Sequence, residues 1–213
     1  MLYKKMFLLI PTASLLLTGC FDKTVSKDDM KKIILDAGDA VTSVTNVRIR
    51  NKIQHSYDYK EGEFYRYHNF ALILAETECV WKENGSYYHY VNYTWTDKYN
   101  TDKEITKEEF DTLMSKCKNE VIKTLLVPVQ RAFDIIDDPA YETTCKSSSG
   151  TYTMKSAKPN TASEGETSNE EKYTIKFKNN LPTNYKIDIN GEQDWKYQYG
   201  KAEFINPKAS TSE

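Results

Sequence analysis

The sequence predicts an α+β protein: one strongly curved antiparallel sheet, an unclosed barrel, with an N-terminal helix and a long Pro-kinked helix on its concave face. Three observations lead to this prediction. Two amphipathic segments begin with helix-capping residues, several segments alternate polar and apolar residues, and the segments occur in the order helix, three strands, helix and then further strands. Because helices and strands do not alternate one by one, a parallel Rossmann-type sheet is not expected.

The first helix is expected to begin after Ser26, which has the chemistry of an N-cap. Asp29 follows three residues later as a variant of the capping box. Apolar residues then recur at helical spacing, namely Met30, Ile33, Ile34, Ala37, Val41 and Val44. They form one stripe on a helix whose opposite face is charged, so this helix is expected to pack against the sheet.

After this helix, the apolar residues recur at every second position instead of every 3.6 positions. One long half-buried strand is predicted from apolar residues of one parity: Val47, Ile49, Ile53, Tyr57 and Tyr59. After a turn at Glu61-Gly62-Glu63, a second strand is predicted over residues 64–81. An Asn84-Gly85 hairpin then leads into a third strand over residues 87–95.

Two registers are compatible with the Asn84-Gly85 hairpin. A two-residue turn pairs Cys79 with Tyr90, whereas a three-residue loop pairs Trp81 with Tyr87. The second register gathers the apolar residues on one face of the hairpin, so we prefer it.

The second helix begins with the capping box Thr106-Lys107-Glu108-Glu109. Its apolar face comprises Phe110, Leu113, Met114, Cys117, Val121, Leu125, Val129, Ala132, Phe133 and Ile136. Pro128 removes a backbone donor inside this pattern and is expected to kink or split the helix.

About four strands are predicted after the second helix. The first covers residues 151–157, and the others centre on Ile175, Ile187 and Tyr197. Residues 158–171 between them are polar and without periodicity, which is typical of an exposed, mobile loop.

The first 20 residues have the pattern of a secretory signal peptide that ends in a cysteine. Lys4 and Lys5 precede an apolar run that is too short to span a bilayer. Leu17-Thr18-Gly19-Cys20 resembles the bacterial lipobox. This resemblance implies cleavage after Gly19, a diacylglyceryl thioether on Cys20 and often acylation, for example with palmitate, of the new amine. The alternative is an ordinary signal peptide with a chance cysteine.

The lipobox interpretation divides the chain into a lipoprotein signal peptide (1–19), a lipidated tether (20–25), a single α+β domain (26–207) that contains the polar loop 158–171, and a polar tail (208–213). Two acyl chains suffice for stable anchoring. The protein is therefore expected at the cell membrane, attached through Cys20 and facing the extracytoplasmic side.

Charge and cysteine content limit the partners. Removal of residues 1–19 leaves 194 of the 213 residues, and the formal net charge of −2 becomes −4 because two lysines are lost. Nucleic acid, which binds basic surfaces, is not an expected partner. Lipidation of Cys20 leaves Cys79, Cys117 and Cys145, so at least one thiol stays unpaired. Their spacings match no zinc motif, and Cys117 is expected to act as a small buried hydrophobe.

No pattern of catalytic or metal-binding residues emerges from the sequence. His55, His68 and His89 form neither an HxH nor an HExxH motif, and GxSxG motifs and glycine-rich phosphate loops are absent. We therefore expect no enzyme, metal site or cofactor. Nine of the 16 tyrosines lie between Tyr57 and Tyr99, which fits a binding surface or simply a strand-rich segment. Ligand-binding residues cannot be assigned, although exposure of Trp81 and Trp95 would favour binding.

The order of elements resembles the LolA/LppX-type lipoprotein-carrier folds, in which helices lid an unclosed β-barrel around an apolar cavity. The likeness rests on an amphipathic helix directly after the lipobox tether, a helical insertion between strand groups and a closing Tyr-rich strand that ends near Asn206-Pro207. It implies a non-catalytic binder of a lipid or another apolar or amphipathic ligand. The alternative is a structural or protein-interaction module of the cell envelope with a solid core.

Overall fold

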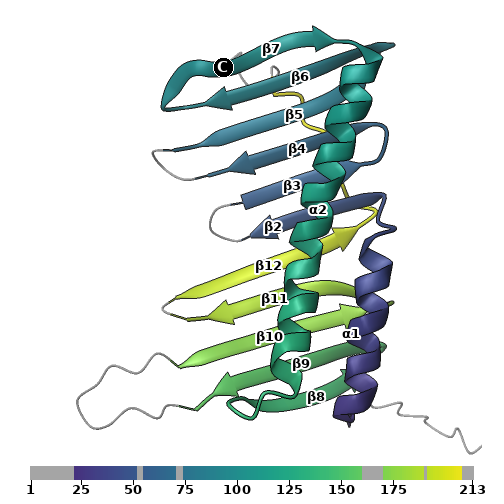
Figure 1. Cartoon of the computed structure of the whole chain (residues 1–213), viewed down its shortest axis with the longest axis vertical. Helices are drawn as coiled ribbons and strands as arrows, with labels where there is room; N and C mark the ends of the chain where they lie inside the picture. The colour runs from purple at the N-terminus through teal and green to yellow at the C-terminus, as the bar shows by residue number, and fades with distance from the viewer. Residues whose placement is uncertain (1–21, 52–54, 71–73, 160–169, 190, 208–213) are drawn as a thin grey trace, which may run out of the picture.

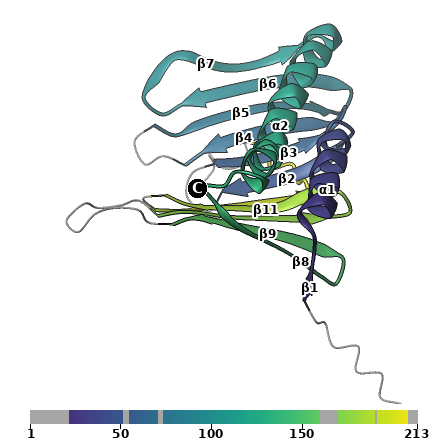
Figure 2. The same ribbon diagram turned by 60° about the horizontal axis from the view of Figure 1, so that its bottom comes forward.

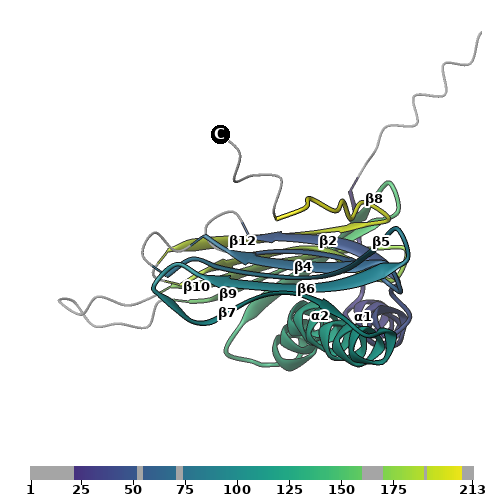
Figure 3. The ribbon, with the colours of Figure 1, turned by 90° about the horizontal axis from the view of Figure 1, so that it is seen from above.

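The computed structural model describes residues 22–51, 55–70, 74–159, 170–189 and 191–207 (Figure 1). In this part of the chain, twelve strands form one antiparallel sheet in the order β1-β8-β9-β10-β11-β12-β2-β3-β4-β5-β6-β7. The predicted α+β class is confirmed, since the sheet is unclosed and both helices lie on one face of it (Figure 3). The predicted lipobox, most of the loop 158–171 and the tail 208–213 lie outside the described residues.

The strands fall into two groups along the chain. The first strand and the N-terminal group are β1 (Lys23–Thr24), β2 (Asn46–Asn51), β3 (His55–Lys60), β4 (Phe64–Asn69), β5 (Glu76–Glu83), β6 (Ser86–Tyr93) and β7 (Thr96–Ile105). The C-terminal group comprises β8 (Glu142–Ser148), β9 (Thr151–Lys158), β10 (Glu171–Lys178), β11 (Leu181–Asp188) and β12 (Glu192–Tyr199). The two groups join in the middle of the sheet, where β12 pairs with β2.

Both helices begin where their capping residues predict. In α1 (Lys27–Val41), the Ser26 hydroxyl accepts a hydrogen bond from the backbone N–H of Asp29. In α2 (Lys107–Ile136), Thr106 and Glu109 form the complete capping box. Pro128 lies inside α2 without splitting it. Figure 1 shows α2 crossing the sheet from β7 to the β8 end, with α1 beside its second half.

Both long strands predicted in the N-terminal half are hairpins, so these two predictions are wrong. The segment predicted as one strand to Tyr59 forms β2 and β3, and residues 64–81 divide between β4 and β5. Cross-strand partners lie on the same face of a sheet. In the hairpin, Val47 lies opposite Tyr59 and Ile49 opposite Tyr57, so these odd-numbered residues share one face, as they would in one continuous strand. The alternation of apolar and polar residues therefore cannot show that the chain turns back on itself.

The preferred hairpin register is also wrong. Asn84 and Gly85 have φ values of 51° and 87°, as a two-residue type I′ turn requires. Cys79 therefore pairs with Tyr90, and Trp81 pairs with Tyr88 rather than Tyr87. The assumption of one apolar face fails because side chains of the segment 200–207 pack against the outer face of this hairpin.

Three strands were not predicted. Lys23–Thr24, within the expected tether, forms β1 beside β8. The polar segments Thr96–Ile105 and Glu142–Ser148 form β7 and β8. Both are poor in large apolar side chains and largely or partly exposed, so they lack the alternation that identifies a half-buried strand.

Candidate functional site

The space between the helices and the sheet is filled with side chains. One apolar cluster joins the buried stripes of α1 and α2 to the concave face of most of the strands. Several of its large members are under 2% exposed, including Met30, Ile34, Leu125, Ile175 and Phe177. Side chains of the described residues therefore pack closely between the helices and the sheet, and a surface depression lies at the margin of this core.

A surface depression of about 490 Å³ lies at one margin, between α2 and β11. Its lining combines apolar and charged side chains: Lys123, Leu126, Val127, Gln130, Arg131, Asp134 and Tyr185. Val127, an apolar side chain, is 52% exposed here. Figure 1 shows that neither helix crosses one end of the strands on this face of the sheet.

A row of aromatic side chains adjoins this depression on the sheet. Trp195 pairs across the strands with Tyr185 and stacks on His55, with ring centroids 5.9 Å apart and planes 7° apart. His55 in turn stacks on Tyr67 at 6.0 Å, and Tyr67 contacts Tyr57 at 4.9 Å. All four side chains of this aromatic row are half-buried. Burial lowers the pKa of His55, which favours the neutral ring.

Polar groups close the depression near the C-terminal end of α2. Arg131 donates hydrogen bonds to the hydroxyls of Tyr141 and Tyr173, over distances of 3.0 and 2.6 Å. The Tyr141 hydroxyl donates to Glu171 over 2.6 Å, and this bond is the main cause that lowers the pKa of Glu171. Arg131 also lies over the Tyr173 ring, with 4.4 Å from its guanidinium carbon to the ring centroid. The depression thus has apolar rings beside it and, at one end, the Arg131 guanidinium, which also pairs with Glu171 at 3.5 Å.

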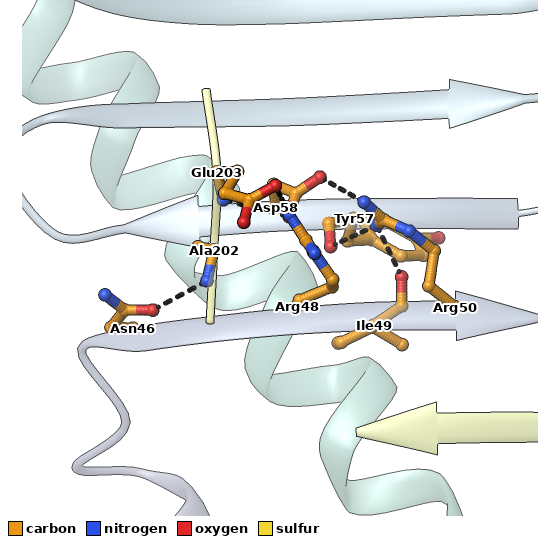
Figure 4. Close-up of polar contacts among 8 residues, drawn as sticks. All are labelled: Asn46, Arg48, Ile49, Arg50, Tyr57, Asp58, Ala202 and Glu203. Carbon is orange, nitrogen blue, oxygen red and sulfur yellow. Dashed lines mark hydrogen bonds and ion pairs between the residues drawn. The ribbon is translucent and has the colours of Figure 1, made fainter. Parts of the chain in front are cut away.

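The outer face of the sheet carries a different cluster, centred on Asp58 (Figure 4). Asp58 is 1% exposed and receives Arg48 Nε at 2.9 Å and Arg50 Nη2 at 2.6 Å. Glu203 binds the other side of Arg48 at 2.7 Å, and its backbone N–H donates to Asp58 over 3.3 Å. These partners satisfy the buried carboxylate, so the cluster is suited to holding the chain together rather than to proton transfer.

The segment 200–207 crosses the outer face above this cluster. The N–H of Ala202 donates to Asn46 Oδ1 over 3.0 Å, which ties the segment to β2. Phe204 contacts the rings of Phe64 and Trp81, each with centroids 5.5 Å away. Figure 3 shows this yellow segment on the side of the sheet opposite the helices. It buries a second, smaller apolar cluster that includes Cys79.

The residues weighed in the sequence lie in separate places. Cys79, Cys117 and Cys145 are buried free thiols, and burial raises the pKa of Cys79 to about 12. The expectation for Cys117, a small buried hydrophobe, is confirmed. Trp81 is buried and Trp95 is 46% exposed. The aromatic row was missed because its four members come from three strands whose pairing the sequence does not reveal.

The histidines do not form a site. His55 belongs to the aromatic row, His68 shares a hydrogen bond of 2.6 Å with Thr77 on the outer face, and His89 contacts Glu78 on the concave face. Among the described residues, no group of three or more His, Cys, Asp or Glu side chains is placed to hold a metal ion. Within the same residues, no helix has the length and apolar character needed to cross a membrane.

The comparisons with known proteins include a structural likeness. No protein-family model matches the chain, and no curated protein matches it. The crystal structure of the Mycobacterium tuberculosis lipoprotein LppX matches with a TM-score of 0.33 and 9% sequence identity, over 85% of this chain and 100% of that chain. A likeness this weak carries no argument about function, so the function must be inferred from the residues of the chain itself.

Proposed function

We propose that the chain is a membrane-anchored extracytoplasmic bacterial lipoprotein that binds an amphipathic ligand, such as a lipid, without catalysis. The observation that carries the ligand proposal is the depression between α2 and β11, with the aromatic row beside it. The anchor proposal rests on the lipobox residues Leu17-Thr18-Gly19-Cys20.

The chemistry of the depression favours a ligand with an apolar chain and an anionic head. Aromatic rings offer broad apolar contact with little loss of side-chain entropy. Lys123 and Arg131 line the same depression as donors for a carboxylate or phosphate, which would compete with their present partners Glu120 and Glu171. Because the core under the helices is filled, the ligand lies along the margin of the sheet rather than inside it.

A matched pair of α2 variants tests the ligand site. Val127 and Phe133 are 52% and 51% exposed, and of the two only Val127 lines the depression beside β11. A chain starting at residue 20, with Cys20→Ser, keeps every described element and serves as the parent. Calorimetric titration with laurate should show binding, with hexanoate as the short-chain control. Val127→Glu should weaken laurate binding by about tenfold or more, because a carboxylate repels the anionic head and is costly against an apolar chain.

Phe133→Glu is the control and should leave laurate binding unchanged. Equal losses in the two variants, or no heat of laurate binding to the parent, would contradict the proposed site. Extraction of the purified parent with organic solvent, followed by mass spectrometry, then identifies any lipid retained from the cell.

The anchor is tested separately in cells. Cys20→Ser should abolish incorporation of labelled fatty acid and release the protein from the membrane fraction, because only the cysteine sulfur can form the thioether. Gly85→Ala, at a distant turn, is a control that should keep the label. Unchanged labelling and fractionation of Cys20→Ser would refute the lipoprotein proposal.

A second candidate function is a protein-interaction module of the envelope. It is favoured by exposed apolar side chains near the loops that join β4 to β5 and β6 to β7: Phe70, Leu74, Trp95 and Tyr99. Backbone and side-chain hydrogen bonds between Ala75 and Thr94 hold these two loops together. Trp95→Ala should abolish partner binding but leave laurate binding intact, which distinguishes the two functions.

A further inference from the structure

The outer face of the C-terminal half carries a regular row of basic side chains. Following the register from β8 across β9, β10 and β11 to β12, the partners are Lys146, Thr153, Lys176, Asn184 and Lys196. Cations thus alternate with small neutral residues, at intervals of two strands or about 10 Å. This spacing allows several lysines on one face without placing like charges directly opposite each other.

A hollow of about 470 Å³ lies at the β8 end of this lysine row. Lys146, Lys155 and Lys176 line it together with threonine and serine side chains from β8 and β9. All three lysines are exposed, so they can reach a surface laid against the sheet. The hollow combines positive charge with hydroxyl donors, which is the chemistry that binds phosphate groups.

On the same face, Lys172 and Lys186 pair with Glu170 and Glu192, and Asn184 donates to Asp194, but the lysines of the row itself are largely unpaired. Lys146 has one carboxylate partner, Asp22, at 3.8 Å, and both side chains are more than half exposed. Among the described residues, no carboxylate lies within 4.0 Å of the ammonium groups of Lys155, Lys176 or Lys196. The half of the outer face over β2–β5 differs, because Asp58 and Glu203 compensate Arg48 and Arg50, and the segment 200–207 covers part of it.

The lysine row begins at the edge of the sheet where the chain would leave the membrane. β1 pairs with β8, placing Thr24 opposite Lys146, and Asp22 lines the hollow itself. Figure 2 shows β1 and β8 at this end of the sheet. Cys20 precedes Asp22 by two residues, so the covalent chain keeps their Cα atoms within about 7 Å of each other. An acyl chain on Cys20 would hold this edge at the bilayer surface.

We propose that the lysine row binds the headgroups of anionic phospholipids in the membrane that carries the anchor. The outer face of β8–β12 then lies toward the bilayer, and the helices and the ligand depression face away from it. The inference rests on the proposed anchor for its geometry. The attraction to anionic headgroups comes from the lysine row, because the mature chain as a whole carries a net charge of −4 and would be repelled by an anionic membrane.

The test uses the unlipidated chain that starts at residue 20 with Cys20→Ser. Its sedimentation with vesicles of phosphatidylcholine and phosphatidylglycerol in equal parts is compared with that on pure phosphatidylcholine. The chain should bind the anionic vesicles only and detach at high salt, where charges are screened. One lysine near an anionic surface strengthens partition about fivefold, so Lys146→Gln, Lys155→Gln and Lys176→Gln together should weaken it about 100-fold.

A matched triple variant removes the same charge elsewhere. Lys32→Gln, Lys98→Gln and Lys116→Gln should leave vesicle binding largely unchanged. The proposal is overturned if both triple variants lose binding equally, if neutral vesicles bind as well, or if inorganic phosphate at low concentration displaces the chain, which would indicate a free-phosphate site. The unlipidated chain lacks the thioether, so its failure to bind anionic vesicles would not bear on the labelling of Cys20. Laurate binding is likewise measured in a separate experiment.

Discussion

The two faces of the sheet bury their side chains by different means. On the concave face, α1 and α2 cover an apolar cluster in which Leu125, Ile175 and Phe177 are fully buried. On the outer face, a buried carboxylate, Asp58, lies beside the smaller apolar cluster, and two arginines and a crossing segment of chain compensate its charge. Apolar packing tolerates many arrangements of similar volume, whereas a buried carboxylate depends on particular partners.

This difference predicts how each face fails. Loss of an apolar side chain on the concave face leaves a cavity, whose cost depends on how far the surroundings relax. Loss of one member of the Asp58 cluster leaves the charged groups that it contacted without that partner. Substitutions on the two faces should therefore differ in how much they lower the free energy of unfolding, in how that loss depends on pH, and in how far they expose the buried cysteines.

The largest effect is expected on the concave face. Phe177→Ala removes a fully buried ring from the core and should lower the free energy of unfolding by about 4 kcal/mol. Phe133→Ala, at a half-exposed position of α2, should change it by only about 1 kcal/mol. Urea unfolding followed by circular dichroism measures both, and similar losses would show that the core is not where the structure places it.

The second effect concerns the outer cluster. Asp58→Ala leaves Arg48 and Arg50 without their shared carboxylate and should cost about 3 kcal/mol in urea unfolding. Asp188→Ala removes an exposed carboxylate from the same face and should be nearly neutral. If the two aspartate variants unfold at the same urea concentration, the Asp58 cluster contributes no more than surface charge.

A smaller effect is expected from the segment that crosses the outer face. Phe204→Ala removes contacts with Phe64 and Trp81 and should cost about 1.5 kcal/mol. It should also speed labelling of Cys79 by a thiol reagent, because Cys79 lies in the same cluster. Ile205→Ala is the exposed control. Faster labelling of Cys117 and Cys145 as well would indicate global destabilisation instead of local opening.

The smallest effect is a pH dependence. The hydrogen bond from Arg48 holds the pKa of Glu203 below its usual range. A lowered pKa adds stability above the unfolded value of about 4.3 and loses it as the pH falls through the folded value. Between about pH 5 and pH 3, the parent should therefore lose stability slightly faster than Glu203→Gln. Parallel curves for the two chains would argue against this ion pair in solution.

The helices could be predicted from the sequence because their signals are local. Ser26 and the Thr106–Glu109 box mark their starts, and the 3.6-residue period identifies the buried stripe of each. The exception is Phe133, which fits the stripe of α2 by spacing but is half exposed and lines a surface pocket together with Leu35 of α1.

The sites could not be predicted because they depend on pairing between distant strands. Arg48 and Asp58 have the parity of a solvent-facing row, and only the hairpin between β2 and β3 brings them opposite each other. The aromatic row likewise needs β12 to lie beside β2 before Trp195 reaches His55. The sequence did contain one sign of the Asp58 cluster. Arg48, Arg50 and Asp58 carry opposite charges at alternate positions that share one face of the sheet.

The pairing of β12 with β2 also has a consequence for biosynthesis. The contact between Asn46 and Ala202 joins residues that are 156 positions apart, so the two groups of strands cannot unite until almost the whole chain has been made. Until then, β2 and β11 each present an unpaired edge, the kind of surface that recruits other chains. High contact order of this type slows folding, so the nascent protein needs protection from aggregation until its last strand is available.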